Sequence, residues 1–138
     1  ILARAPAPEV SGLRLYGLEL GLAFQIVDDI LDLTADEATL GKPGASDLRQ
    51  GLVTLPLLLH LEQAPDDDPA RAVLAGDRSE ERIRQAIGRV RSSSAIASAR
   101  SLARKHAAAA QEALLVCPPG PARQSLADLA GFVAERGQ

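Results

Sequence analysis

Three aspartates near residue 30 are the side chains in this sequence best suited to chemistry. They lie in the segment Phe24-Gln25-Ile26-Val27-Asp28-Asp29-Ile30-Leu31-Asp32. At 100° per residue, a helix places all three carboxylates on one surface, with Gln25 one turn before them. Carboxylates about 6 Å apart repel each other by roughly 3 kcal/mol at an effective dielectric of 20, and the end of a helix adds to this penalty. A divalent cation reverses both effects, and hard oxygen ligands suit Mg²⁺. We therefore predict a magnesium site at Asp28, Asp29 and Asp32.

A glycine-containing loop with one lysine follows these acids. Gly41 and Gly44 allow close approach of the backbone to a ligand, and Lys42 places a cation just beyond the carboxylates. A metal site beside a lysine suits a diphosphate, because metal ions bridge its oxygens and the ammonium neutralises the remaining charge. An exposed turn and a solvated acidic surface are the alternative readings. The short spacing between the two features, and the apolar residues around the acids, favour a binding site.

The elements expected to position these residues are all helices. Apolar residues at spacings of three and four predict a helix from Ser11, as its N-cap, to about Leu33. A loop should follow over 34–47, and then a helix from Leu48 to about Gln63 that bends at Pro56. Further helices are expected from Asp68 and Pro69, from the break at 76–81, over about 94–116 and over about 122–135. With no strand pattern, this predicts an all-α fold of five or six helices and a single domain over 1–138.

Composition excludes several classes of protein. The net charge of −3 and the 2% of aromatic residues offer no basic surface and no stacking platform for nucleic acid. A single cysteine, Cys117, forms no internal disulfide and is expected to be inert. His60 and His106 lack partners at metal-ligand spacing, so we expect structural or surface roles for both. No uninterrupted apolar run reaches about 18 residues, and no signal peptide opens the chain, so a cytoplasmic location is expected. Because methionine is absent, we expect a piece of a longer chain.

The motifs taken together resemble those of a known family. Phe24-Gln25-x-x-Asp28-Asp29-x-x-Asp32, Gly41-Lys42, Asp47-Leu48 and Gly51-x-x-Thr54-x-Pro56 are similar to the second aspartate-rich region of the trans-isoprenyl (polyprenyl) diphosphate synthases. This highly specific pattern covers residues 21–58, and the remainder is similar only in helical character and length. The resemblance implies the C-terminal portion of a helical bundle of the isoprenoid synthase type, with its active site in a central cavity.

The resemblance also implies a reaction and residue roles. The family's prenyltransferases condense isopentenyl diphosphate with an allylic diphosphate that ionises with the help of Mg²⁺. Asp28 and Asp29 would be metal ligands, with Asp32 supporting them through water or neighbouring contacts. Lys42 would contact the allylic diphosphate, and Phe24 and Gln25 would line the site near the reacting carbons. Members form homodimers or pair with a second subunit, and would meet a membrane only through the product.

Two departures from the family pattern leave alternatives open. Leu52 stands where many members carry a further diphosphate-binding lysine. The first aspartate motif and the isopentenyl diphosphate site lie upstream in the family and are absent here, so the 138 residues alone are expected to be inactive. One alternative is a non-catalytic or regulatory subunit of a heteromeric synthase. A class I terpene cyclase is a further alternative, but its N-D-x-x-S-x-x-x-E motif is missing. The product chain length is not encoded in this region.

Overall fold

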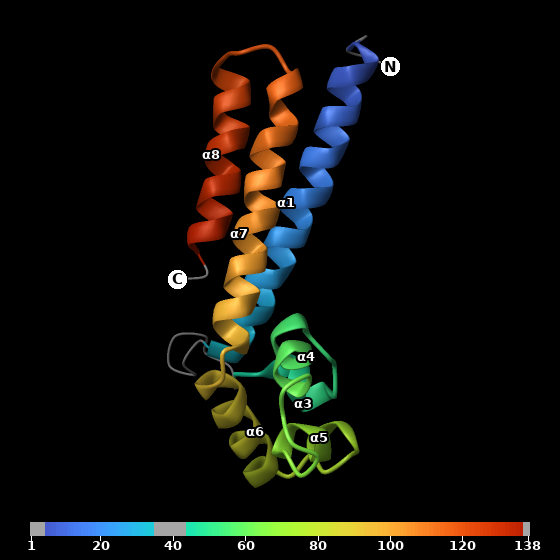
Figure 1. The fold of residues 1–138 in the computed structure, drawn as a ribbon, viewed down its shortest axis with the longest axis vertical. Coiled ribbons are helices and arrows are strands. Elements are labelled where there is room, and N and C mark those ends of the chain that lie inside the picture. Colours follow the sequence, from blue (N-terminus) through green and yellow to red (C-terminus); the bar gives the residue numbers. More distant parts are fainter. Residues whose placement is uncertain (1–4, 35–43, 137–138) are drawn as a thin grey trace. The chain divides into compact units, whose positions relative to one another are not determined.

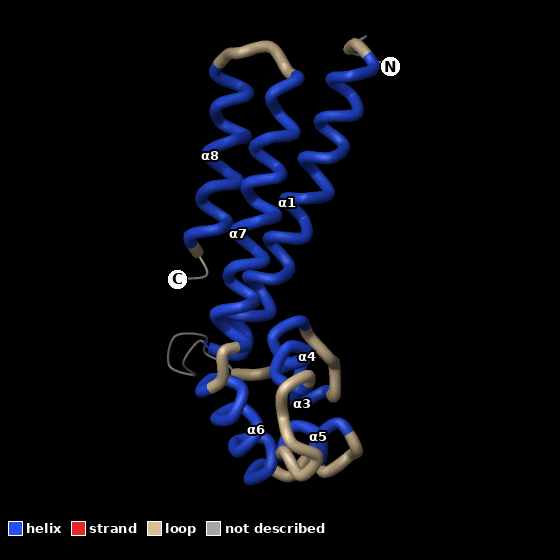
Figure 2. Tube along the Cα trace, viewed as in Figure 1, coloured by secondary structure: helices blue, strands red, loops and turns tan. Residues whose placement is uncertain are grey.

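The computed structural model describes residues 5–34 and 44–136, and these ranges consist of helices joined by turns and loops (Figures 1 and 2). No strand occurs in them, which confirms the predicted all-α fold. The chain groups into two compact units. The first unit contains Ile1–Val27 and Ser101–Gln138, and the second contains Asp28–Arg100. The prediction of one domain over 1–138 is not tested by this grouping and stays a prediction.

The first unit is built from three long helices. They are α1 (Ala7–Thr34), whose residues from Asp28 onward belong to the second unit, α7 (Ala95–Ala113), which enters the first unit at Ser101, and α8 (Pro121–Glu135). These helices lie side by side in Figure 1. Tyr16 of α1 packs with Ala110, Leu114 and Ala130, and its hydroxyl donates a hydrogen bond of 2.9 Å to the Leu126 carbonyl. Burial raises the pKa of the Tyr16 hydroxyl. Small alanine side chains thus let the helices approach around one aromatic ring.

The start of α1 differs from the sequence-based prediction. Ser11 was predicted as the N-cap, but the helix begins at Ala7 and Ser11 lies inside it. The first turn already forms with a hydrogen bond of 3.1 Å from the Val10 amide to the Pro6 carbonyl. Pro8 is compatible with this turn, because the amides at a helix start have no partner within the helix. Residues 7–10, which precede the predicted start, therefore form the first turn of the helix.

By length and composition only, α1 could cross a membrane. Core helices of globular proteins meet the same criterion. Arg14 and Glu19 interrupt its apolar sequence, and the Glu19 Oε2 atom lies 2.7 Å from Nδ1 of His106 in α7. This ion-pair geometry, together with the buried Tyr16, is typical of a helix within a bundle, and gives His106 the structural role that was predicted.

The second unit contains four shorter helices besides the end of α1. They are α3 (Ser46–Gln50), α4 (Leu55–Leu61), α5 (Pro69–Leu74) and α6 (Glu80–Ser92). Their core consists of fully buried aliphatic side chains, including Ile30, Leu33, Leu48, Leu57, Val73 and Val90. Arg91 of α6 also donates a hydrogen bond of 2.6 Å from Nε to the Leu33 carbonyl near the end of α1. The end of α1 is therefore held in this unit by both packing and hydrogen bonding.

The predicted bent helix from Leu48 to Gln63 is wrong, because the chain forms two helices there. Gly51 ends α3 with φ of 80°, a left-handed conformation that favours glycine. Pro56 lies in the first turn of α4, where its missing amide leaves no hydrogen bond unmade, and so it starts a helix instead of bending one. The later helices match the predicted ones closely, except that a 3₁₀ turn over Leu114–Val116 ends the helix predicted to reach Val116.

Replacing Gly51 by alanine should destabilise the second unit. A left-handed backbone costs an L-residue about 1–2 kcal/mol, and the new Cβ would overlap the Arg78 guanidinium, which must then move. Urea unfolding should show a loss of about that size. Gly88→Ala in α6 is the matched control, because a Cβ there meets no described atom and alanine has the higher helix propensity. Equal stability of the two variants would contradict the role of Gly51.

Asp68 starts α5, as predicted. Its Oδ1 atom accepts a hydrogen bond of 2.8 Å from the Ala70 amide, and its Oδ2 atom lies 3.2 Å from Nε2 of His60. Both residues are buried, so His60 has the structural role that was predicted for it. The acidic segment Asp66–Asp68 is thus a helix start.

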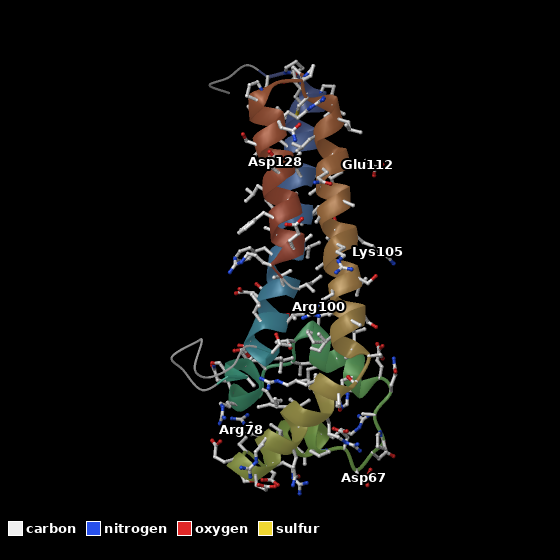
Figure 3. All side chains as sticks on the ribbon, turned by 90° about the vertical axis from the view of Figure 1, so that its left-hand side faces the viewer. Asp67, Arg78, Arg100, Lys105, Glu112 and Asp128 are labelled. Atoms are coloured by element: carbon white, nitrogen blue, oxygen red, sulfur yellow. The ribbon has the colours of Figure 1, made fainter. Side chains whose placement is uncertain are left out.

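Asp68→Ala should lower the free energy of unfolding by about 2 kcal/mol. The change removes a helix cap, which contributes about 1 kcal/mol, and leaves the buried His60 ring without this partner. Thermal or urea unfolding measures the loss. Asp67→Ala, at the adjacent exposed position labelled in Figure 3, should change stability little. A similar loss of stability in both variants would contradict the role of Asp68 as helix cap and partner of His60.

Candidate functional site

The three aspartates predicted to bind metal lie in the last turns of α1, within the second unit. Asp28 is exposed, Asp29 is 8% exposed and Asp32 is partly buried. The Oδ2 atom of Asp29 lies 3.4 Å from the Leu55 amide at the start of α4, which orients this carboxylate. The three side chains therefore share one helix end but have different surroundings.

Asp32 binds the start of α3 with both carboxylate oxygens. Its Oδ1 atom accepts a hydrogen bond of 3.0 Å from the Ser46 amide, and its Oδ2 atom accepts one of 3.2 Å from the Asp47 amide. The Asp32 carbonyl accepts a third, of 2.8 Å, from the amide of Ala45. Backbone N–H groups thus bind both carboxylate oxygens. In this arrangement Asp32 positions the start of α3.

Asp47 joins this group of acids, and sequence reasoning gave it no role. Its pKa is raised, first by burial and then by the charges of Asp32, Asp29 and Asp28. The negative field of the α1 carboxylates therefore reaches Asp47 at the start of α3. No helical spacing could have found it, because Asp47 lies on a different helix from the three aspartates. The only signal was its place in the motif with Leu48.

Two further side-chain contacts also hold the start of α3. Arg49 donates a hydrogen bond of 3.1 Å from Nε to the Gly44 carbonyl, and its Nη1 atom lies 2.5 Å from Oε1 of Glu80. This pairing lowers the pKa of the Glu80 carboxyl. Together with Asp32, these contacts fix residues 44–47 at the start of α3.

These acids fit a Mg²⁺ ion that is shared with a ligand. Within residues 5–34 and 44–136, no three histidine, cysteine, aspartate or glutamate side chains converge closely enough to hold a metal ion by themselves. Mg²⁺ is usually bound by one or two carboxylates, with water and phosphate oxygens completing its shell. The exposed Asp28 carboxylate and the Asp29 carboxylate, which is oriented by the Leu55 amide, are donors of this kind.

The other predicted site residues lie on both sides of this cluster in the sequence. Phe24 is 46% exposed and Gln25 is exposed, one turn before Asp28 and Asp29 on α1. Lys42 lies outside the described residues, so its predicted contact stays a prediction. Leu52, the departure from the family pattern, is 52% exposed. The structure thus places the Asp47 amide against the Asp32 carboxylate, and Phe24 and Gln25 one turn before Asp28 on α1.

Comparisons with known proteins agree on one family. The family model described as "Polyprenyl synthetase" matches residues 1–90. The "Short chain isoprenyl diphosphate synthase" of Methanothermobacter thermautotrophicus is 38% identical over 137 residues, which cover 99% of this chain and 42% of the relative. The "Heptaprenyl diphosphate synthase component 2" of Geobacillus stearothermophilus is 37% identical over 139 residues, 99% of this chain and 42% of that protein.

A solved structure supports the same grouping. The crystal structure of polyprenyl synthase from Caulobacter crescentus, described as "complexed with calcium and isoprenyl diphosphate", is 35% identical to this chain. The match has a TM-score of 0.85 and covers 97% of this chain and 42% of the other. The chain thus spans about two fifths of the length of the proteins it matches, and it has their helical fold over that part.

Proposed function

Because this chain belongs to the polyprenyl synthetase family, we propose that its complete gene product, with whatever residues precede Ile1, is a prenyltransferase. It would join isopentenyl diphosphate to an allylic diphosphate. The observation that supports this proposal is the placement of Asp28, Asp29 and Asp32 at one end of α1, with Asp47 at the start of α3, where its amide and that of Ser46 bind the Asp32 carboxylate. Such a group is unfavourable unless cations bind there, and a diphosphate brings cations with it.

The side chains at the end of α1 would have different roles in binding a metal-bound diphosphate. When bound, Mg²⁺ would neutralise the charge that develops on the leaving diphosphate. Asp28 and Asp29 would hold the ion, and the Caulobacter relative, complexed with calcium and isoprenyl diphosphate, supports a divalent metal beside a diphosphate in this family. Asp32 would keep α3 and Asp47 in place through its hydrogen bonds. Lys42 would place its ammonium against the diphosphate.

The reaction itself needs few protein groups beyond these. The C–O bond of the allylic diphosphate breaks, diphosphate leaves, and the double bond of isopentenyl diphosphate attacks the allylic cation. A proton is then lost and a new double bond forms. Phe24 and Gln25, one turn before the acids, would lie along the reacting carbons and keep water away from the cation. Stabilising the leaving group is therefore the main task of the residues in this chain.

The direct test is incorporation of labelled isopentenyl diphosphate by the complete gene product with an allylic diphosphate. Mg²⁺ should be required, and EDTA should abolish incorporation. Lys42→Ala should lower kcat at least tenfold, because a cation facing the leaving group acts mainly in the transition state. Lys105→Ala, on α7 away from the acids in the sequence and exposed (Figure 3), is the charge-matched control. Activity without any divalent metal would refute the proposal.

A second candidate is a subunit that works only with a partner. The name "component 2" of the Geobacillus relative supports this alternative for a heteromeric enzyme, against a homodimer that is active alone. Assaying the purified complete gene product separates them. Turnover by the single polypeptide supports the homomeric enzyme, and turnover only after a second polypeptide is added supports the heteromeric one. The class I terpene cyclase is not supported by any of the matched proteins named above.

A further inference from the structure

A polar cavity lies within the second unit, lined by the end of α4 and by the junction of α6 and α7 (these helices are labelled in Figure 1). Its volume is about 350 Å³, at the lower end of the range for small-molecule sites. The lining residues lie within 59–65, within 89–95 and at Asp68. None of the four acids of the candidate metal site lines it, so a ligand bound there would use a different set of side chains.

One ring nitrogen of His60 is left available to a ligand in this cavity. His60 is 8% exposed and lines the cavity, and its Nε2 atom lies 3.2 Å from Oδ2 of Asp68. Its Nδ1 atom has no hydrogen bond among the described residues. In the same part of the chain, the only fully buried side-chain nitrogen or oxygen without a partner is Nε of Arg100, so Nδ1 of His60 is open to solvent. Because His60 lines the cavity, a molecule bound there can reach this nitrogen.

Two more side chains bring unused hydrogen-bond donors to the cavity. The Nε atom of Arg89 lies 3.7 Å from Oδ2 of Asp68, and the Arg89 side chain is 60% exposed. Its two Nη groups make no hydrogen bond within the described part of the chain. Gln63, in the turn after α4, accepts a hydrogen bond of 3.5 Å through Oε1 from the Ser94 hydroxyl. The Nε2 hydrogens of Gln63 therefore remain unbonded among the described residues, and both side chains offer N–H groups to a ligand.

The acceptor atoms at the cavity are already occupied. The Asp68 side chain is 1% exposed; its Oδ1 atom accepts a hydrogen bond of 2.8 Å from a backbone amide of α5, and its Oδ2 atom faces His60 and Arg89. The Oγ atom of Ser93 accepts a hydrogen bond of 3.2 Å from the first amide of α7, where the helix dipole places partial positive charge. What remains is a set of donors beside positive charge. Such a set is complementary to phosphate oxygens, which bind guanidinium and other N–H groups strongly.

We propose that this cavity binds a small phosphate monoester, with its phosphate group at Arg89, His60 and the start of α7 and the rest of the molecule against Gln63. A phosphate group alone would leave much of the cavity unfilled, so an ester with a hydroxylated body fits its size better. Leu59 and Pro65 supply apolar wall for the carbon atoms of that body. Binding there needs no Mg²⁺ and none of the residues that would hold the diphosphate, so it is independent of prenyltransferase activity.

The test titrates glycerol 3-phosphate into the complete gene product in EDTA, by isothermal titration calorimetry. The ester should bind saturably, glycerol should not bind, and inorganic phosphate should compete with the ester. Arg89→Gln should raise Kd by about tenfold or more, the effect of losing a charge-assisted hydrogen bond. Gln63→Ala should raise the Kd of the ester about fivefold and leave that of inorganic phosphate unchanged. Arg84→Gln is the matched control on α6, because Arg84 pairs with Glu81 outside the cavity, and should leave Kd unchanged.

A further variant separates loss of binding from loss of structure. Ser94→Asp adds a negative charge to the cavity wall just before α7, where an acid stabilises the helix. This variant should therefore be at least as stable in urea as wild type, yet raise the Kd of the ester by about tenfold or more through repulsion. No saturable binding at millimolar ester, or an unchanged Kd in both Arg89→Gln and Ser94→Asp, would overturn the proposal. Loss of binding in Lys42→Ala would place the ester at the diphosphate site instead, and would overturn it too.

Discussion

Asp28→Asn should lower kcat of the complete gene product by about 10²–10³-fold at saturating Mg²⁺ and substrates, the range for removing one group that stabilises charge in a transition state. Asp28 is exposed, and within residues 5–34 and 44–136 it has no hydrogen bond to the backbone comparable to those of Asp32. Its carboxylate is therefore free to bind a metal ion. Asparagine keeps the shape but loses the charge, so the Mg²⁺ concentration for half-maximal activity should rise as well.

The same substitution should not harm the fold. In EDTA, Asp28 adds to the charge that raises the pKa of Asp47, so Asp28→Asn should unfold at a urea concentration equal to or higher than wild type. Asp67→Asn is the matched control, an exposed aspartate in the loop before α5 (Figure 3), and should retain full activity. A fall of less than tenfold in kcat, or an unchanged Mg²⁺ requirement, would remove Asp28 from the metal site.

Much of the fold could be predicted because apolar periodicity encodes it directly. The long helices α1, α7 and α8 repeat apolar residues at helical spacing, and prolines or N-cap residues mark several helix starts. Asp68 with Pro69 was found in this way, since both residues act at a helix start for reasons local to the chain. Predictions of this kind depend only on neighbours within one or two turns.

The errors arose where backbone conformation or a long-range contact decides the structure. Gly51 ends α3 because it adopts a left-handed conformation, which the apolar pattern across Leu48 to Gln63 does not reveal. At the start of α1, the first turn accepts Pro8, so the helix extends beyond the last residue that periodicity could support. In both cases the pattern gave the type of element correctly and its boundary wrongly.

In the candidate site too, the residues placed by local sequence could be predicted and those placed by long-range contacts could not. Asp28, Asp29 and Asp32 could be grouped from the sequence because one helix carries them. Asp47 could not, because it lies on another helix and its position depends on the amides that Asp32 binds. The partners of Tyr16 were likewise not predictable, since Ala110, Leu126 and Ala130 lie more than 90 positions away in the chain.

Asp32→Ala should lower the free energy of unfolding by about 3 kcal/mol, the opposite of the effect expected for Asp28. Its two oxygens accept hydrogen bonds from the Ser46 and Asp47 amides, and hydrogen bonds to a charged group each contribute about 1.5–3 kcal/mol. Partial exposure of Asp32 places the sum near the lower end. Asp32→Asn keeps one acceptor oxygen and should lose about half as much.

Activity and metal dependence then distinguish anchoring from ligation. If Asp32 positions α3, its alanine variant should lose activity because Asp47 and the segment leading into α3 shift, while Mg²⁺ at higher concentration should not restore the rate. A ligand should behave differently, as Asp28→Asn is expected to, with activity partly recovered at high Mg²⁺ and no loss of stability. Asp128→Ala on α8 (Figure 3) is the control for stability, because this exposed aspartate accepts a hydrogen bond only from the Gln124 side chain among the described residues. An Asp32→Ala protein as stable as wild type, with a raised Mg²⁺ requirement, would show that this carboxylate binds metal and that its hydrogen bonds to α3 are incidental.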